Sequence, residues 1–140
     1  MIPPAEAVES VEAWRRDPNA PAPGTPLGPL DAIPDGGVRE FRFGEGRRVF
    51  SLLVVHRGGE ARAYVNACPH VWLPLTYRHD RVVSGDGRRL ICSNHAAEFA
   101  VEDGSPLSGP GAGPATPDCR LTAVPVHIDE RGQLRIGNPA

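Results

Sequence analysis

The 140-residue sequence contains no lysine, so all 15 of its basic side chains are arginines. Together with 17 acidic side chains they give a formal net charge of −2 at pH 7. Proteins that bind nucleic acids or anionic membranes usually carry a clear excess of basic residues on one face. We therefore expect no nucleic-acid partner and no membrane partner.

Long apolar segments are also absent. No run of about 18 apolar residues occurs, so the sequence predicts no transmembrane helix. The first residues, Met1 to Pro4, lack the basic and apolar regions of a secretory signal, and we expect a cytoplasmic location. Three cysteines are too few for a disulfide framework, and in a reducing compartment cysteines more often lie buried, bind metals or take part in catalysis.

Glycine and proline are abundant, with 16 of each. Five prolines fall within residues 17–29, which predicts an extended arm or linker. Ahead of it, Val8, Val11 and Trp14 recur at intervals of three, which indicates a short helix over residues 5–16. The sequence thus divides into an N-terminal arm, residues 1–27, and one domain, residues 28–140.

From Val38 onward, short apolar or alternating segments are separated by glycine-containing turns, a pattern typical of β-strands. Three hairpins are expected, and the first turns at Gly58-Gly59. Such closely spaced strands predict a compact all-β fold, an antiparallel sandwich or barrel. The expected strands cover residues 38–43, 49–56, 61–65, 81–83, 88–92, 121–128 and 134–136.

Two short motifs, each at the end of an expected strand, combine a thiol with an imidazole. Cys68-Pro69-His70 reads C-x-H, and Cys92-Ser93-Asn94-His95 reads C-x-x-H. Thiolate and imidazole ligands suit both iron–sulfur clusters and zinc. Two cysteines and two histidines could also close a tetrahedral zinc site, so the spacing alone leaves both metals open.

The wider context resembles the Rieske [2Fe–2S] family, whose two ligand loops read C-x-H and C-x-x-H. The resemblance spans roughly residues 28–137. Its supporting features are Asn66-Ala67 before Cys68, Phe99 after His95, Glu102-Asp103-Gly104 and Gly109-Pro110.

The resemblance implies a base β domain with a small cluster-binding subdomain and one [2Fe–2S] cluster per chain. Cys68 and Cys92 would hold one iron, and His70 and His95 the other. Gly109-Pro110 would match the family's proline loop, which covers the cluster.

The charges agree with that assignment. Two ferric ions and two sulfides sum to +2, which two thiolates cancel, so the reduced centre carries only −1. Neutral imidazoles in place of two thiolates make reduction easier, and Rieske potentials run from about −150 to +300 mV, against about −400 mV for plant-type ferredoxins.

Differences from the high-potential members indicate which branch of the family this chain resembles. High-potential Rieske proteins carry an additional cysteine in each loop, where this chain has Leu73 and Asn94. Their hydroxyl-bearing positions are Ala97 and Phe99 here, and Ala96 replaces a common glycine. The chain therefore resembles the ferredoxin or oxygenase-associated branch, which uses no disulfide in these loops.

This resemblance implies a single-electron carrier without an active site of its own, which receives electrons from a reductase and passes them to an oxygenase or another terminal enzyme. Two alternatives stay open: a redox-sensing regulatory module with the same cluster, and a structural zinc-binding domain. Oligomeric state and the identity of the partners are not predicted.

The remaining candidates have simpler interpretations. Cys119 is expected to be a thiol that binds no metal, and His56 and His127 to be ordinary strand residues. Trp72 and Leu73 are expected to shield the cluster. His79 is a candidate docking residue, and the arginine group Arg78, Arg81, Arg88 and Arg89 is either a solvated hairpin or a docking patch for an acidic redox partner.

Overall fold

The computed structural model describes residues 19–44, 49–67, 74–77, 81–93, 97–108 and 120–137. Within these ranges every strand pairs with its neighbours in antiparallel fashion, and the one helix is a single 3-10 turn. The expected all-β fold is confirmed, and the expected helix over residues 5–16 lies outside the described residues. The elements are β1 (Pro26–Pro29), η2 (Leu30–Ala32), β2 (Val38–Phe43), β3 (Phe50–Arg57), β4 (Glu60–Val65), β5 (Arg89–Ile91), β6 (Glu98–Ala100), β7 (Pro106–Ser108), β8 (Ala123–Val124), β9 (Val126–Ile128) and β10 (Gln133–Ile136).

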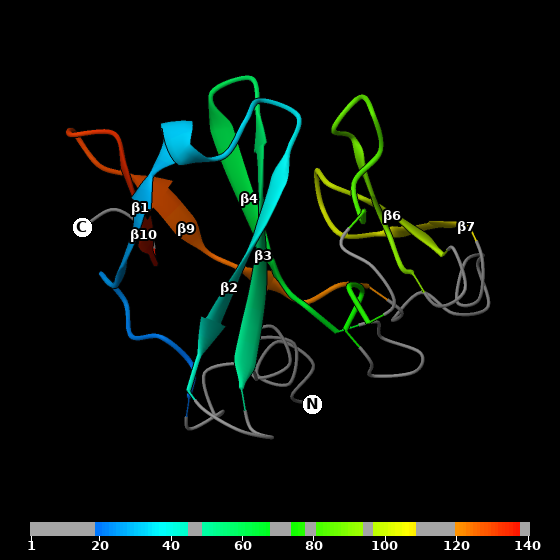
Figure 1. Ribbon diagram of the computed structural model, residues 1–140, viewed down its shortest axis with the longest axis horizontal. Coiled ribbons are helices and arrows are strands. Elements are labelled where there is room, and N and C mark those ends of the chain that lie inside the picture. The colour runs from blue at the N-terminus through cyan, green and yellow to red at the C-terminus, as the bar shows by residue number, and fades with distance from the viewer. Residues whose placement is uncertain are drawn as a thin grey trace, which may run out of the picture.

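A four-stranded sheet in the order β2-β3-β4-β8 lies in the middle of the molecule (Figure 1). Successive side chains of a strand point to opposite faces. On β3, Leu52 and Val54 belong to one hydrophobic cluster, and Leu53 and Val55 belong to another. Because β3 is covered on both faces, its sequence reads as a continuous apolar run and does not alternate.

One face of this sheet packs against a three-stranded sheet in the order β1-β10-β9. Its core includes Leu27 of β1 and Leu134 and Ile136 of β10. The chain before β1 is held there too, since the Gly24 amide donates a hydrogen bond of 2.7 Å to the Ile136 carbonyl. The boundary predicted between residues 27 and 28 falls within β1, and the division into arm and domain stays a prediction.

The other face packs against a smaller sheet in the order β5-β6-β7, drawn apart from the other two in Figure 1. Tyr64 of β4 crosses this interface, and its hydroxyl donates a hydrogen bond of 2.5 Å to the Val101 carbonyl. Phe99 of β6 fills the same cluster and is only 1% exposed. This smaller sheet ends in the second ligand motif, as expected for a cluster-binding subdomain.

The first expected hairpin forms as predicted, and the second forms only in part. Gly58 and Gly59, with φ of 60° and 81°, make the turn between β3 and β4. In the second hairpin the chain turns as expected after Ser84, whose carbonyl accepts the Gly87 N–H at 2.9 Å, but residues 81–83 form no strand. They meet β5 through one isolated bridge, between Val83 and Leu90.

The third hairpin differs from the prediction, because residues 121–128 are not one strand. Pro125 separates β8, which pairs with β4, from β9, which pairs with β10. Proline has no amide hydrogen to donate to a ladder, so the chain passes from one sheet to the next at this residue.

Candidate metal centre

The predicted ligands fall at the edge of what the structure describes. Cys92 lies within the described ranges, whereas Cys68, His70 and His95 lie outside them, as do Trp72, Leu73, His79, Gly109-Pro110 and Cys119. The residues on either side of both motifs are described: Asn66-Ala67 and Pro74–Tyr77 around the first, and Cys92-Ser93 and Ala97 around the second. The geometry of these flanking residues decides how the two motifs are held.

Asn66 closes the first ligand loop. It follows β4 directly, is 4% exposed, and uses both ends of its side-chain amide. Its Oδ1 accepts the Leu75 backbone N–H at 2.8 Å, and its Nδ2 donates to the Thr76 hydroxyl at 2.8 Å. The segment that carries Cys68 and His70 therefore begins and ends at one buried side chain.

The second ligand loop is closed by the backbone itself. The Cys92 amide donates a hydrogen bond of 2.8 Å to the Ala97 carbonyl, directly beyond the last pair of the β5–β6 ladder, Ile91 with Glu98. The β5–β6 hairpin is therefore closed by Cys92 and Ala97. His95 follows Cys92 by three residues in the sequence, between the two ends of this hairpin.

One hydrogen bond ties the two loops together. The Ser93 amide donates at 2.9 Å to the carbonyl of Leu75, the residue whose own amide is bound to Asn66. Leu75 thus contacts the base of one loop through its N–H and the other through its C=O. The bases of both motifs lie side by side, although they are far apart in the sequence.

Cys92 is fully buried, with 0% of its surface exposed, in a cluster that includes Leu75, Ala97 and Phe99. A thiolate in such apolar surroundings is costly unless a cation compensates its charge. A metal cation held by this sulfur would satisfy that requirement, so the position is compatible with a thiolate ligand of a metal. Among the described residues, which include only one of the four predicted ligands, no group of three or more His, Cys, Asp or Glu is placed to bind a metal.

A polar network behind the first loop was not anticipated from the sequence. Glu40 of β2 accepts hydrogen bonds from Ser51 of β3 at 2.6 Å and from Asn66 at 3.4 Å, and Asn66 also donates to the Ser51 hydroxyl at 3.1 Å. The only hint in the sequence is an asparagine after a strand, where its amide commonly bonds nearby backbone groups. Nothing in the sequence pairs it with Glu40.

The pKa of the Glu40 carboxyl is lowered from its usual 4.5. Partial burial alone would raise that pKa, but the hydrogen bonds from Ser51 and Arg42, the charge of Arg42 and the hydrogen bond from Asn66 outweigh it. Arg42 lies 3.0 Å from the carboxylate. Glu40 is therefore ionised at neutral pH, so that an anion anchors the network.

The expectations for two other candidates, His56 and His127, are confirmed. His56 lies in β3 with its Nδ1 2.6 Å from the Ile33 carbonyl oxygen, and His127 lies in β9 with its Nδ1 2.7 Å from that of Gly137. Both are strand residues engaged with backbone. Arg89 forms an ion pair with Glu98 at 2.5 Å. Arg78 lies outside the described residues, and the docking role of this group is untested.

The comparisons with known proteins agree with this geometry. The family model for the Rieske [2Fe-2S] domain matches residues 25–126, which is most of the chain. No curated protein matches the chain by sequence. Within the described ranges, no helix has the length and apolarity needed to cross a bilayer.

Solved structures share the fold at low identity. The ferredoxin of carbazole 1,9a-dioxygenase from Nocardioides aromaticivorans IC177 is 22% identical, with a TM-score of 0.60 over 82% of this chain and 99% of that one. The ferredoxin of Sphingomonas yanoikuyae B1 is 22% identical, with a TM-score of 0.58 over 83% and 99%. A chain from the reduced complex between oxygenase and ferredoxin in carbazole 1,9a-dioxygenase is 19% identical, with a TM-score of 0.65 over 96% of this chain but 35% of that one. With the family model covering most of its length and its fold shared with these structures, the chain belongs to the Rieske [2Fe–2S] domain family.

Proposed function

We propose that this chain holds one [2Fe–2S] cluster, with Cys68 and Cys92 on one iron and His70 and His95 on the other. Family membership supports the cofactor, and the bond from Ser93 to Leu75 is the observation that carries the assignment. That bond places the bases of both ligand loops next to each other, as a shared cluster requires. When bound, such a cluster gains and loses one electron at a time.

The described residues anchor the bases of both ligand loops and shield the side of Cys92 from water. Asn66 and Leu75 fix the ends of the first loop, and the Cys92–Ala97 backbone bond fixes the second. Ala97 and Phe99, which are 0% and 1% exposed, keep water from the side of Cys92. A centre whose ligand loops are anchored at their bases would reorganise little when its charge changes by one unit, which would favour fast electron transfer.

The proposed role is that of an electron carrier between a reductase and an oxygenase or other terminal enzyme. Structural neighbours that are ferredoxins, one from a carbazole 1,9a-dioxygenase system, support this role. We propose that electrons leave from the His70/His95 edge, since these ligands lie further into the loops than the cysteines. The cytoplasm is the compartment in which we expect this exchange.

The first experiment measures metal, sulfide and EPR in protein purified from iron-replete cells. We expect two iron atoms and two acid-labile sulfides per chain, and a rhombic EPR signal after reduction. Cys92→Ser should lose the cluster, whereas Cys119→Ala should keep it. Stoichiometric zinc without sulfide would contradict the proposal and favour the structural zinc domain.

The second experiment separates a carrier from a redox sensor. Holoprotein reduced under anaerobic conditions is mixed with oxygenase components of its own host, and reoxidation is followed by absorbance. A carrier is reoxidised faster by one of them than in buffer alone. If none of them accelerates reoxidation, the carrier role is wrong, even if the cluster is present.

A further inference from the structure

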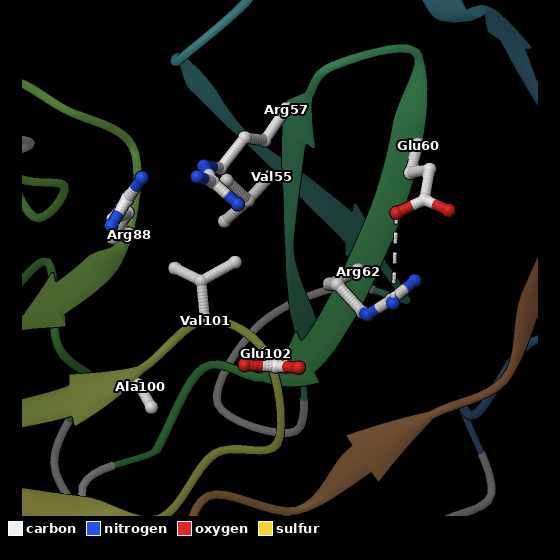
Figure 2. A pocket seen from close by; sticks show the side chains of 8 residues that line it. All are labelled: Val55, Arg57, Glu60, Arg62, Arg88, Ala100, Val101 and Glu102. Carbon is white, nitrogen blue, oxygen red and sulfur yellow. Dashed lines mark ion pairs between the residues drawn. The ribbon is translucent and has the colours of Figure 1, made fainter.

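A pocket of about 330 Å³ lies between the central sheet and the small sheet (Figure 2). Residues of β3 and β4 form one wall, and the residues before β5 and at the end of β6 form the other. Its apolar lining residues are Ala100, which is partly exposed, and Val55 and Val101, which lie almost fully buried at its floor. The volume is at the lower end of the range for small-molecule sites, about 300–1,000 Å³.

Two guanidinium groups face each other across this pocket. Figure 2 shows Arg57 extending from the end of β3 toward Arg88 on the opposite wall. Within the part of the chain that the structure describes, neither guanidinium has a hydrogen bond or an ion pair. Arg62, in contrast, lies 3.8 Å from Glu60 and also bonds the Ala61 carbonyl.

Neither of two nearby carboxylates, Asp86 and Glu102, lies between these two guanidinium groups to neutralise them. Asp86 feels the charge of Arg88, but its Oδ1 accepts the Ser84 hydroxyl and the Arg88 backbone N–H. Glu102 lies beyond Val101, away from both guanidinium groups (Figure 2). Two like charges that converge over an apolar floor repel each other, and an anion between them removes that repulsion.

We propose that this pocket binds a carboxylate on a short apolar stem. The planar, forked guanidinium matches a carboxylate with paired hydrogen bonds. The stem would lie on Ala100, the apolar lining residue with the most exposed surface, above the nearly buried Val55 and Val101. Glu102 at the far end disfavours a second carboxylate, so the ligand is a monoanion. Its source is either a small free acid or a glutamate side chain of another protein, which present the same group.

The site is separate from the proposed metal centre. Arg88 precedes Cys92 by four residues along β5, which corresponds to about 13 Å at the rise of a strand. Arg57 and Glu60 flank the β3–β4 turn, at the opposite end of β4 from Asn66. The proposal therefore does not depend on the cluster, and its failure would leave the electron-carrier proposal intact.

The test is a titration of the ¹⁵N-labelled holoprotein with butyrate, followed by the arginine Nε–H signals in NMR. We expect saturable shifts of the Arg57 and Arg88 signals. The uncharged analogue butyramide and equal concentrations of sodium chloride should give none. Arg57→Gln or Arg88→Gln should each weaken binding about tenfold, the loss expected for one charge-assisted bond. Arg131→Gln, in the exposed turn before β10, is the matched control and should bind as the wild type does.

Blocked N-acetylglutamate amide identifies the source. If it binds as tightly as butyrate, a glutamate side chain fits the pocket; if only butyrate binds, the ligand is a free acid. Arg57→Lys, which keeps the charge but loses the fork, provides a second variant if Arg57→Gln fails to fold, and we expect it to bind more weakly than wild type. Shifts that stay linear, or that sodium chloride reproduces, would overturn the proposal, as would an equal loss in Arg131→Gln.

Discussion

A single residue, Asn66, closes the first ligand loop, because its side-chain amide carries both a donor and an acceptor. Its acceptor takes the Leu75 amide, and its donor serves Thr76 and Ser51. The first ligand loop therefore depends on the side-chain amide of Asn66, which is not one of the predicted metal ligands.

Replacing Asn66 by alanine should lower the free energy of unfolding by about 1–3 kcal/mol, the cost of leaving a buried partner such as the Leu75 N–H unsatisfied. Iron content per chain should fall, since the first loop loses its closure. Urea unfolding and iron analysis of the purified holoprotein measure both effects. Thr76→Val, which leaves the Leu75 bond in place, is the control and should keep its iron. An Asn66→Ala protein with wild-type stability would show that the loop closes without this side chain.

Glu40 makes the stability of the protein depend on pH. Because its folded-state pKa is lowered, the ionised form stabilises the fold, and this contribution is fully present above the ordinary value of 4.5. It should disappear as the pH falls from about 4.5 through the lowered value. Glu40→Gln should flatten the unfolding free energy over that interval, as measured by urea titrations at several pH values. A wild-type slope in the Glu40→Gln protein would place the titrating group elsewhere.

At the scale of elements, the β3–β4 hairpin shows most simply how backbone conformation limits the sequence. Its two turn residues have positive φ, which side chains with a Cβ rarely adopt. A Cβ added at Gly59 would meet no atom within 4 Å, so only its conformation, with φ of 81°, opposes substitution. A loss of stability on substituting Gly59 would therefore come from its backbone conformation and not from a steric clash.

Gly59→Val should destabilise the protein by about 1–2 kcal/mol, the cost of forcing a branched residue into the left-handed region. Gly85, in the turn before β5, offers a matched comparison, since it has open space around it without a positive φ. Gly85→Val should therefore cost much less than Gly59→Val in thermal or urea unfolding. Equal losses at the two positions would mean that backbone conformation is not the cause.

At the scale of the whole molecule, the potential of the proposed cluster reflects its surroundings. Ala97 and Phe99 are buried beside Cys92 and carry no hydroxyl to donate to a cluster sulfur. Such hydrogen bonds stabilise the extra negative charge of the reduced state, so their absence lowers the potential.

The midpoint potential should therefore lie in the lower half of the range of about −150 to +300 mV. Ala97→Ser, which introduces one donor, should raise it in a redox titration followed by EPR or circular dichroism. Ser93→Ala removes a hydroxyl elsewhere in the same loop region and serves as a comparison. A wild-type midpoint near the top of the range would refute the argument.

The sequence predicted the long strands well, because β3 and β4 carry enough apolar residues to show their pattern. It missed β6 and β7, since strands of three residues show no periodicity. It also placed β1 in an extended arm, although β1 pairs with β10, and it joined β8 to β9 across Pro125. The ligands could be proposed from spacing and resemblance alone. The contacts that hold them, such as Asn66 with Leu75, depend on residues that come together only after folding.

The pairing of β1 with β10 has a consequence for how the chain folds. A hydrogen bond from Arg135 to the Gly24 carbonyl spans 111 residues, and Pro26 pairs with Arg135 in the same ladder. Local hairpins such as β3–β4 close small loops and can form within microseconds. The β1–β10–β9 sheet must instead wait for a strand at the far end of the domain, and a high contact order slows folding. During synthesis on the ribosome, β1 therefore remains an unpaired edge until β10 has emerged.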